Sequence, residues 1–149
     1  VTIAVFCALA FSGSQAATLV TRALGLGEVT PKDWWRIVRK ELVSGVLLGS
    51  TLALLGWLCV EFFTFVGHAR AESPTDPHWA QWLALSVAGS IFGVVLWGIL
   101  LGSTLPLFMR RFGIDPATAS SPMVATLMDA SGTLIYLGMA ILILTGVLV

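Results

Sequence analysis

SPMVATLMDASGTLIYLGMAILILTGVLV, residues 121–149, is long enough to form a helix that crosses a bilayer, which takes about 20 predominantly apolar residues. It carries an acid, Asp129, about 12 Å from its start and therefore near the middle of a hydrocarbon core about 30 Å thick. A charge at the centre of a membrane helix costs about 2.5 to 3.5 kcal/mol on insertion scales. Such a residue therefore normally faces a water-filled cavity, a partner charge or an ion.

Small and polar residues share one face of this predicted helix with Asp129. Steps of three and four residues from Asp129 reach Pro122, Ala125, Thr126, Gly132, Thr133 and Tyr136. We predict that this stripe lines a path for a positively charged species, entered from the Ser121 end. The alternative is a purely structural carboxylate that is hydrogen-bonded to a neighbouring helix or neutralised.

The composition excludes a soluble domain. The chain has 149 residues, of which 57% are apolar and 11% charged, whereas soluble domains average about 25% charged residues. The mean hydropathy of +0.94 agrees with an all-α integral membrane protein. The net charge is zero, and no nucleic-acid partner and no enzymatic activity are expected. Cys7 and Cys59 fall within apolar segments and are interpreted as packing residues.

Four segments are long enough to span the membrane, at residues 1–24, 42–66, 82–109 and 121–149. Most lysines and arginines lie in or beside the first and third connections: Arg22, Lys32, Arg36, Arg39, Lys40, Arg110 and Arg111. By the positive-inside rule, residues 25–41 and 110–120 are cytoplasmic, and residues 67–81 and the C-terminus are outside. Val1 would then start outside, so we expect residues 1–149 to be the transmembrane ion-conducting domain of a five-helix subunit, comprising its helices 2 to 5. The membrane is expected to be a bacterial inner membrane.

The two longer connections have different character. Thr30 followed by Pro31 is a helix-start signal, and Trp34 and Trp35 follow among basic residues. This predicts a short amphipathic helix at the membrane interface, which would serve mainly as an anchor and alternatively as a lipid-specific site. The second connection contains His68 and His78, but their spacing does not favour a metal site.

Glycines recur at four-residue spacing within the predicted spans: Gly45 and Gly49, Gly89 and Gly93, Gly98 and Gly102. This spacing lets helix backbones approach closely in lipid. The close approach could occur within one subunit or between subunits.

The first segment offers a second polar stretch, SGSQAATLVTR, residues 12–22, with Ser12, Gln15 and Arg22 roughly on one face. Hard divalent cations prefer oxygen ligands, and Mg²⁺ keeps its waters, so a wide site with carboxylates, hydroxyls and carbonyls suits it. One carboxylate is a poor divalent site, whereas two related by a dimer axis provide two charges at the same depth. The sequence therefore favours Mg²⁺ as a transported ion in a homodimer embedded in the lipid bilayer.

The run LPLFMRRFGIDPATASSPMVATLMDASGTLIYLGMA resembles the end of the membrane domain of MgtE-type magnesium transporters, and SGSQAATLVTRALGLGE resembles that family's second membrane helix. The resemblance implies a homodimer of five-helix subunits with the pore between them. It gives Asp129 the place of the pore aspartate that holds hydrated Mg²⁺ with its symmetry mate. Ala125 takes the place of the residue whose carbonyl faces the same ion, and Ser121 lies at the cytoplasmic pore mouth. This chain has Phe11-Ser12 where many members have Gly-Asn.

Mg²⁺ transport is thus the expected function, with metal residues Asp129 and Ala125 and pore-lining residues Ser12, Gln15, Ser121, Pro122, Thr126, Gly132 and Thr133. An ion-coupled Mg²⁺ exchanger that uses the same site is the alternative. A membrane-embedded phosphotransferase would need several acids near one interface, whereas seven of the eight acids lie in connections or near segment ends.

Overall fold

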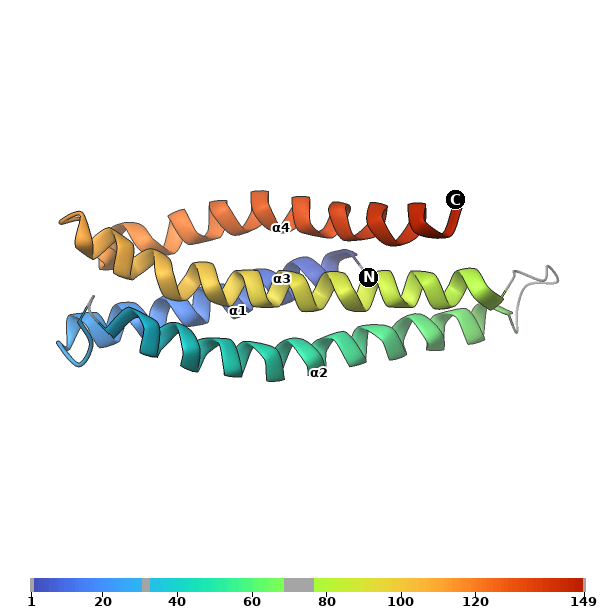
Figure 1. The fold of residues 1–149 in the computed structure, drawn as a ribbon, viewed down its shortest axis with the longest axis horizontal. Coiled ribbons are helices and arrows are strands. Elements are labelled where there is room, and N and C mark those ends of the chain that lie inside the picture. The colour runs from blue at the N-terminus through green and yellow to red at the C-terminus, as the bar shows by residue number, and fades with distance from the viewer. Residues whose placement is uncertain (1, 31–32, 69–76, 149) are drawn as a thin grey trace.

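The computed structural model describes residues 2–30, 33–68 and 77–148, with side chains for residues 13–30, 33–66, 80–115, 123–143 and 145. Its long helices lie side by side and reverse direction from one to the next (Figure 1): α1 (Thr2–Gly25), α2 (Trp34–His68), α3 (Pro77–Arg111) and α4 (Pro116–Leu148). The all-α prediction is confirmed.

Three of the four predicted spans are confirmed as helices long and apolar enough to cross a membrane. They comprise Trp34–Val66, Ala80–Arg111 and Met123–Ile143. The remaining segment is helical as α1, and its crossing of the membrane stays a prediction.

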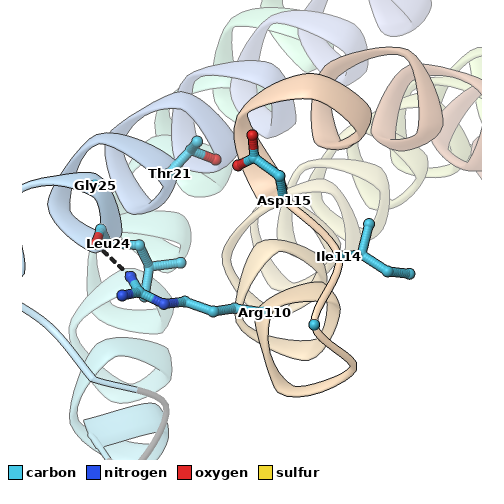
Figure 2. A pocket seen from close by; sticks show the side chains of 7 residues that line it. Thr21, Leu24, Gly25, Arg110, Ile114 and Asp115 are labelled. Carbon is cyan, nitrogen blue, oxygen red and sulfur yellow. Dashed lines mark hydrogen bonds between the residues drawn. The ribbon is translucent and has the colours of Figure 1, made fainter.

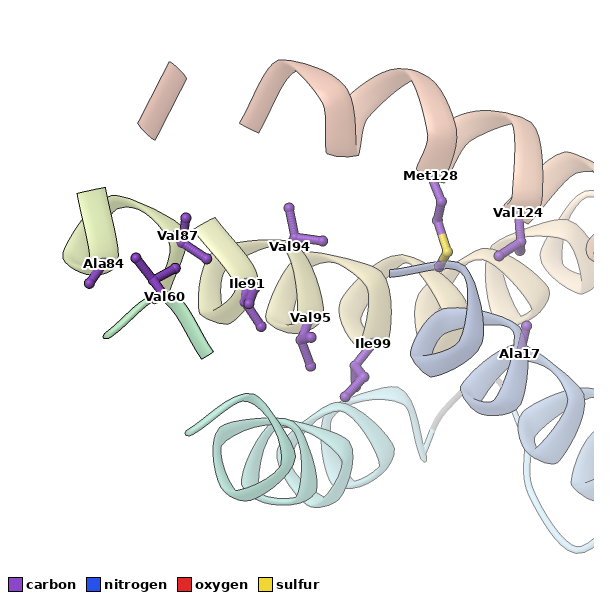
Figure 3. Close-up of a cluster of buried hydrophobic side chains, with 10 residues drawn as sticks. All are labelled: Ala17, Val60, Ala84, Val87, Ile91, Val94, Val95, Ile99, Val124 and Met128. Carbon is purple, nitrogen blue, oxygen red and sulfur yellow. The ribbon is translucent and has the colours of Figure 1, made fainter. Parts of the chain in front are cut away.

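α3 is the centre of the bundle, because it contacts each of the other three helices while α1 also contacts α4. Val94 points toward α4, whereas Val95 and Ile99 point toward α2 (Figure 3). Val94 and Val95 are 1% and 0% exposed, so α3 is buried on two faces. Met128 and Val124 attach α4 to the same cluster.

Glycines make the helix contacts close. A Cβ on Gly102 of α3 would overlap the Gly13 carbonyl of α1, so only glycine allows these two backbones to touch. Gly45 and Gly49 of α2 instead face the side chains of Ile99 and Phe92 of α3, and a Cβ at either glycine would come within 3.1 Å of them. The described glycine pairs therefore serve packing within the subunit, which was one of the two alternatives.

The ends of α1 and α3 are built alike. Gly27 and Gly113 have φ angles of +71° and +75°, a conformation that glycine adopts at little cost. The amides of Glu28 and Ile114 then bond the carbonyls of Ala23 and Met109, at 3.1 Å in each case. This arrangement satisfies helix-end carbonyls that would otherwise lack partners.

Two predicted boundaries differ from the structure. Residues 34–41 are helical, but they are the first turns of α2 instead of a separate interfacial helix. Ile37 packs against Val20, Leu24 and Leu107, and Val38 is buried, so this segment is held by the subunit's own core. The fourth helix begins at Pro116 and not at Ser121, because Asp115-Pro116 provides an earlier cap and first-turn proline.

Candidate functional site

Asp129 lies on α4, about 20 Å along the helix axis from the first residue, Pro116. Its side chain is exposed at the surface of the subunit. The neighbours Val124 and Met128 are each 1% exposed and pack against α3 and α1. The burial of these two residues turns the Asp129 carboxylate away from the bundle interior.

Of the five described members of the predicted stripe, only Ala125 and Thr126 are exposed like Asp129, and Tyr136 packs against the core. Ala125 and Thr126 are exposed, one turn before Asp129, while Thr133 is half-buried one turn after it. The Thr133 hydroxyl donates to the Asp129 main-chain carbonyl at 2.7 Å. Gly132, in contrast, is buried. Ala125 and Thr126 thus share an exposed helix face with the carboxylate, and the pore-lining role of the predicted residues stays a prediction.

α1 contains residues at the same depth along the bundle as Asp129. A Cβ on Gly13 would overlap the Met128 side chain, which places Gly13 beside Met128. Gln15 is exposed two residues beyond Gly13, so it lies within about 5 Å of Asp129 in depth along the bundle, from the helical rise. The side chains of Ser12, Ser121 and Pro122 fall outside those described.

The subunit alone does not provide a metal centre among its described residues. They contain no group of three or more His, Cys, Asp or Glu side chains close enough to hold a metal ion. Among the predicted site residues, Asp129 carries the one carboxylate, and Gln15, Ala125 and Thr126 have only neutral oxygens. A complete divalent site at this depth therefore needs ligands from outside the subunit or from water.

A cavity with a mixed polar and apolar lining lies where α1 ends and the chain turns from α3 to α4 (Figure 2). It has a volume of about 400 Å³ and is lined by Thr21, Leu24, Gly25, Arg110, Gly113, Ile114 and Asp115. The Arg110 guanidinium donates to the Leu24 carbonyl. Arg110 therefore caps the C-terminal end of α1 and ties it to α3, a role that sequence analysis missed because the arginine was used only to assign orientation.

A second polar contact joins α4 to α3. The Trp97 indole N–H of α3 donates to the Ser131 hydroxyl at 2.8 Å, and that hydroxyl donates to the Leu127 carbonyl. Trp97 and Ser131 fix the rotation of α4 two residues from Asp129. No sequence motif marks this pair, since it joins residues 34 positions apart.

Comparison with known proteins finds a matching family and several similar relatives. Residues 11–139 match the family MgtE, described as a divalent cation transporter. The chain is 40% identical over 137 residues to the magnesium transporter MgtE of Thermus thermophilus, covering 91% of this chain and 27% of that protein. It is 27% identical over 129 residues to the magnesium transporter MgtE of Bacillus subtilis, covering 87% of this chain and 26% of the relative. The magnesium transporter MgtE of Enterococcus faecalis is 25% identical over 129 residues, with 87% and 25% covered.

The long apolar helices and these relatives together define a helical integral membrane protein. The chain belongs to the MgtE family of divalent cation transporters. It spans about a quarter of the length of the curated relatives it matches.

Proposed function

We propose that this chain is the ion-conducting part of a Mg²⁺ transporter, in which the Asp129 carboxylates of two subunits hold one hydrated Mg²⁺ ion on a two-fold axis. The observation that carries the proposal is the exposure of Asp129 partway along a membrane helix. A carboxylate facing acyl chains at that depth would cost several kcal/mol. A second copy of the same face covers it and leaves room for a cation.

Two-fold symmetry also provides the charge that one subunit lacks. An axis through the exposed face of α4 brings two carboxylates to one depth, and two negative charges match one divalent cation. Because these charges repel each other without a counterion, the pair stabilises a bound cation in preference to an empty pore.

The groups around Asp129 suit an ion that keeps its water. Ala125 and Thr126 are small and exposed, so they leave space beside the carboxylate. Mg²⁺ dehydrates reluctantly and is usually held through several of its waters. Support for Mg²⁺ also comes from the relatives, each of which is named a magnesium transporter.

The membrane potential would drive the ion inward. In the predicted orientation, residues 25–41 and 110–120 face the cytoplasm, and residues 67–81 and the C-terminus face outside. An inside-negative potential contributes about 2.3 kcal/mol per charge per 100 mV, or about 4.6 kcal/mol for a divalent ion. Uptake then needs no coupled ion, which separates this mechanism from an exchanger.

The test is Mg²⁺ flux into liposomes that contain the purified protein and a Mg²⁺-sensitive dye, driven by a K⁺ diffusion potential. We expect flux that follows the voltage without a Na⁺ or proton gradient, and a loss of at least about tenfold in Asp129→Asn, which keeps the shape and removes the charge. Glu61→Gln removes a carboxylate from α2 and is the matched control, expected to conduct normally. Normal flux in Asp129→Asn contradicts the site, and flux that requires a second ion gradient favours the exchanger.

A further inference from the structure

The first turns of α2 carry a cationic surface. Trp35 and the three cations that follow it are exposed there. They line a hollow of about 520 Å³ whose lining residues are Trp35, Arg36, Arg39, Lys40, Val43 and Ser44. Because α2 is about 52 Å long at the helical rise, its ends extend beyond a hydrocarbon core of about 30 Å. Its first turns therefore lie at headgroup depth.

An apolar hollow adjoins this cationic one. It has a volume of about 480 Å³ and is lined by Trp35, Arg39, Leu42, Val43, Val46 and Leu47. Trp35, Arg39 and Val43 line both hollows. Beyond them, Leu47 and Leu54 remain exposed at 66% and 56%, so an apolar stripe continues along the helix toward the bilayer centre. The surface is thus cationic at one end and apolar at the other.

Two nearby acids border part of this cationic surface. Glu28 and Asp33 line a third hollow together with Arg36 and Lys40. The Asp33 carboxylate accepts bonds from the Thr30 hydroxyl and amide, at 2.7 and 3.1 Å. Arg39 is absent from that hollow, so it is the cation least balanced by these two acids.

We propose that this surface binds one anionic phospholipid, with its phosphate at Arg39, Arg36 and Lys40 and an acyl chain along Val43, Val46 and Leu47. The guanidinium of Arg39 matches the geometry of phosphate oxygens. Trp35 lines both hollows, where the cationic part of the surface meets the apolar part. Amphipathic indole rings favour such a position at the interface between membrane and water. The inference does not depend on the pore at Asp129.

A lipid fits this surface better than a second copy of the chain. In a dimer whose two-fold axis is perpendicular to the membrane, residues at equal depth face each other. A contact through this part of α2 would therefore bring Arg36, Arg39 and Lys40 against the same three cations, which repel. An anionic headgroup neutralises them instead.

The test is native mass spectrometry of the detergent-purified protein with an equimolar mixture of phosphatidylglycerol and phosphatidylcholine of identical acyl chains. We expect preferential retention of phosphatidylglycerol by at least about fivefold, since one basic side chain near an anionic lipid is worth about 1 kcal/mol. Arg39→Gln should reduce this preference by about fivefold, and the double variant Arg36→Gln/Lys40→Gln should reduce it as well.

Arg111→Gln is the matched control, because it removes one exposed arginine from the last turn of α3. It should keep the wild-type preference. Equal retention of the two lipids by the wild type overturns the proposal. An equal loss of lipid preference in Arg39→Gln and Arg111→Gln also overturns it, because it would indicate a nonspecific attraction of anionic lipid to positive charge. The elution volume of each variant in size-exclusion chromatography verifies that it remains folded.

Discussion

Met128 and Asp129 are consecutive residues of α4 that meet opposite environments: Met128 is 1% exposed beside Gly13 of α1, whereas Asp129 is exposed at the subunit surface. Successive residues of a helix point about 100° apart. Rotating α4 to bury the carboxylate would therefore expel Met128 from the core. The packing of one side chain thus fixes the direction of the other.

Mg²⁺ should stabilise the folded dimer through Asp129. A ligand that binds only the folded state at 100 times its dissociation constant adds about 2.7 kcal/mol of stability. We expect Mg²⁺ to raise the melting temperature of the wild type, measured by circular dichroism, and to have little effect on Asp129→Ala. The same variant should still elute as a dimer. An equal Mg²⁺-induced shift in both proteins would place the bound ion elsewhere.

The contact between α1 and α3 should depend on the absence of a side chain at Gly102. Gly102→Ala places a methyl group against the Gly13 carbonyl, and we expect a loss of about 1 to 3 kcal/mol from this overpacking. Gly138→Ala is the control, since a Cβ there meets nothing within 4 Å. That variant should be neutral or slightly more stable, because alanine favours helix. Thermal unfolding in detergent measures both, and equal melting temperatures would show that the two backbones are not in contact.

The hydrogen bond between Trp97 and Ser131 should couple α3 to α4. In a double-mutant cycle of Trp97→Phe and Ser131→Ala, we expect an interaction free energy of about 0.5 to 1.5 kcal/mol, the range for a neutral hydrogen bond. The control is a second double-mutant cycle that combines Trp97→Phe with Ser50→Ala on α2. The free-energy changes of these two substitutions should be additive. Additivity of the Trp97 and Ser131 changes would mean that the bond contributes nothing.

The start of α2 should respond to acid through Asp33. Bonds from the Thr30 hydroxyl, then from the Thr30 amide, and the charge of Arg36 lower the pKa of Asp33 below its ordinary value of 3.8. A lowered folded-state pKa contributes stability above the unfolded pKa, and this stability is lost as the pH falls through the folded pKa. Carbon-13 NMR titration of the Asp33 carboxyl should give a pKa that rises toward 3.8 in Thr30→Val. Thr51→Val, which removes a hydroxyl bonded elsewhere on α2, should leave the titration unchanged.

The helical fold followed from hydropathy, because uninterrupted apolar segments have no alternative to helix in lipid. The glycine spacing at Gly98 and Gly102 also indicated a close approach of backbones, although its partner, Gly13, has no matching glycine in its own segment. Helix ends were harder to predict. The polar segment at Trp34–Lys40 was separated from the following span on composition alone, and the packing of Ile37 and Val38 that continues the helix is a tertiary effect.

The candidate site was predicted in part. The periodicity of small and polar residues grouped Ala125 and Thr126 with Asp129 on one helix face, and all three are exposed in the structure, while their role as a pore lining stays a prediction. It did not reveal that Gly132 is buried, since a glycine fits both a pore lining and a tight contact. The contacts of Arg110 with Leu24 and of Trp97 with Ser131 join residues far apart in the chain, and no local pattern could predict them.

The central claim is that two Asp129 carboxylates share one hydrated cation. The most direct measurement is a structure of the assembled protein in a bilayer mimetic with Mn²⁺ substituted for Mg²⁺, because Mn²⁺ can be located by its anomalous scattering. We predict one anomalous peak on the two-fold axis, at the depth of Asp129 and within one water layer of both carboxylates, that disappears in Asp129→Ala. Two Asp129 side chains facing the acyl chains, or separated by tens of ångströms, would contradict the claim.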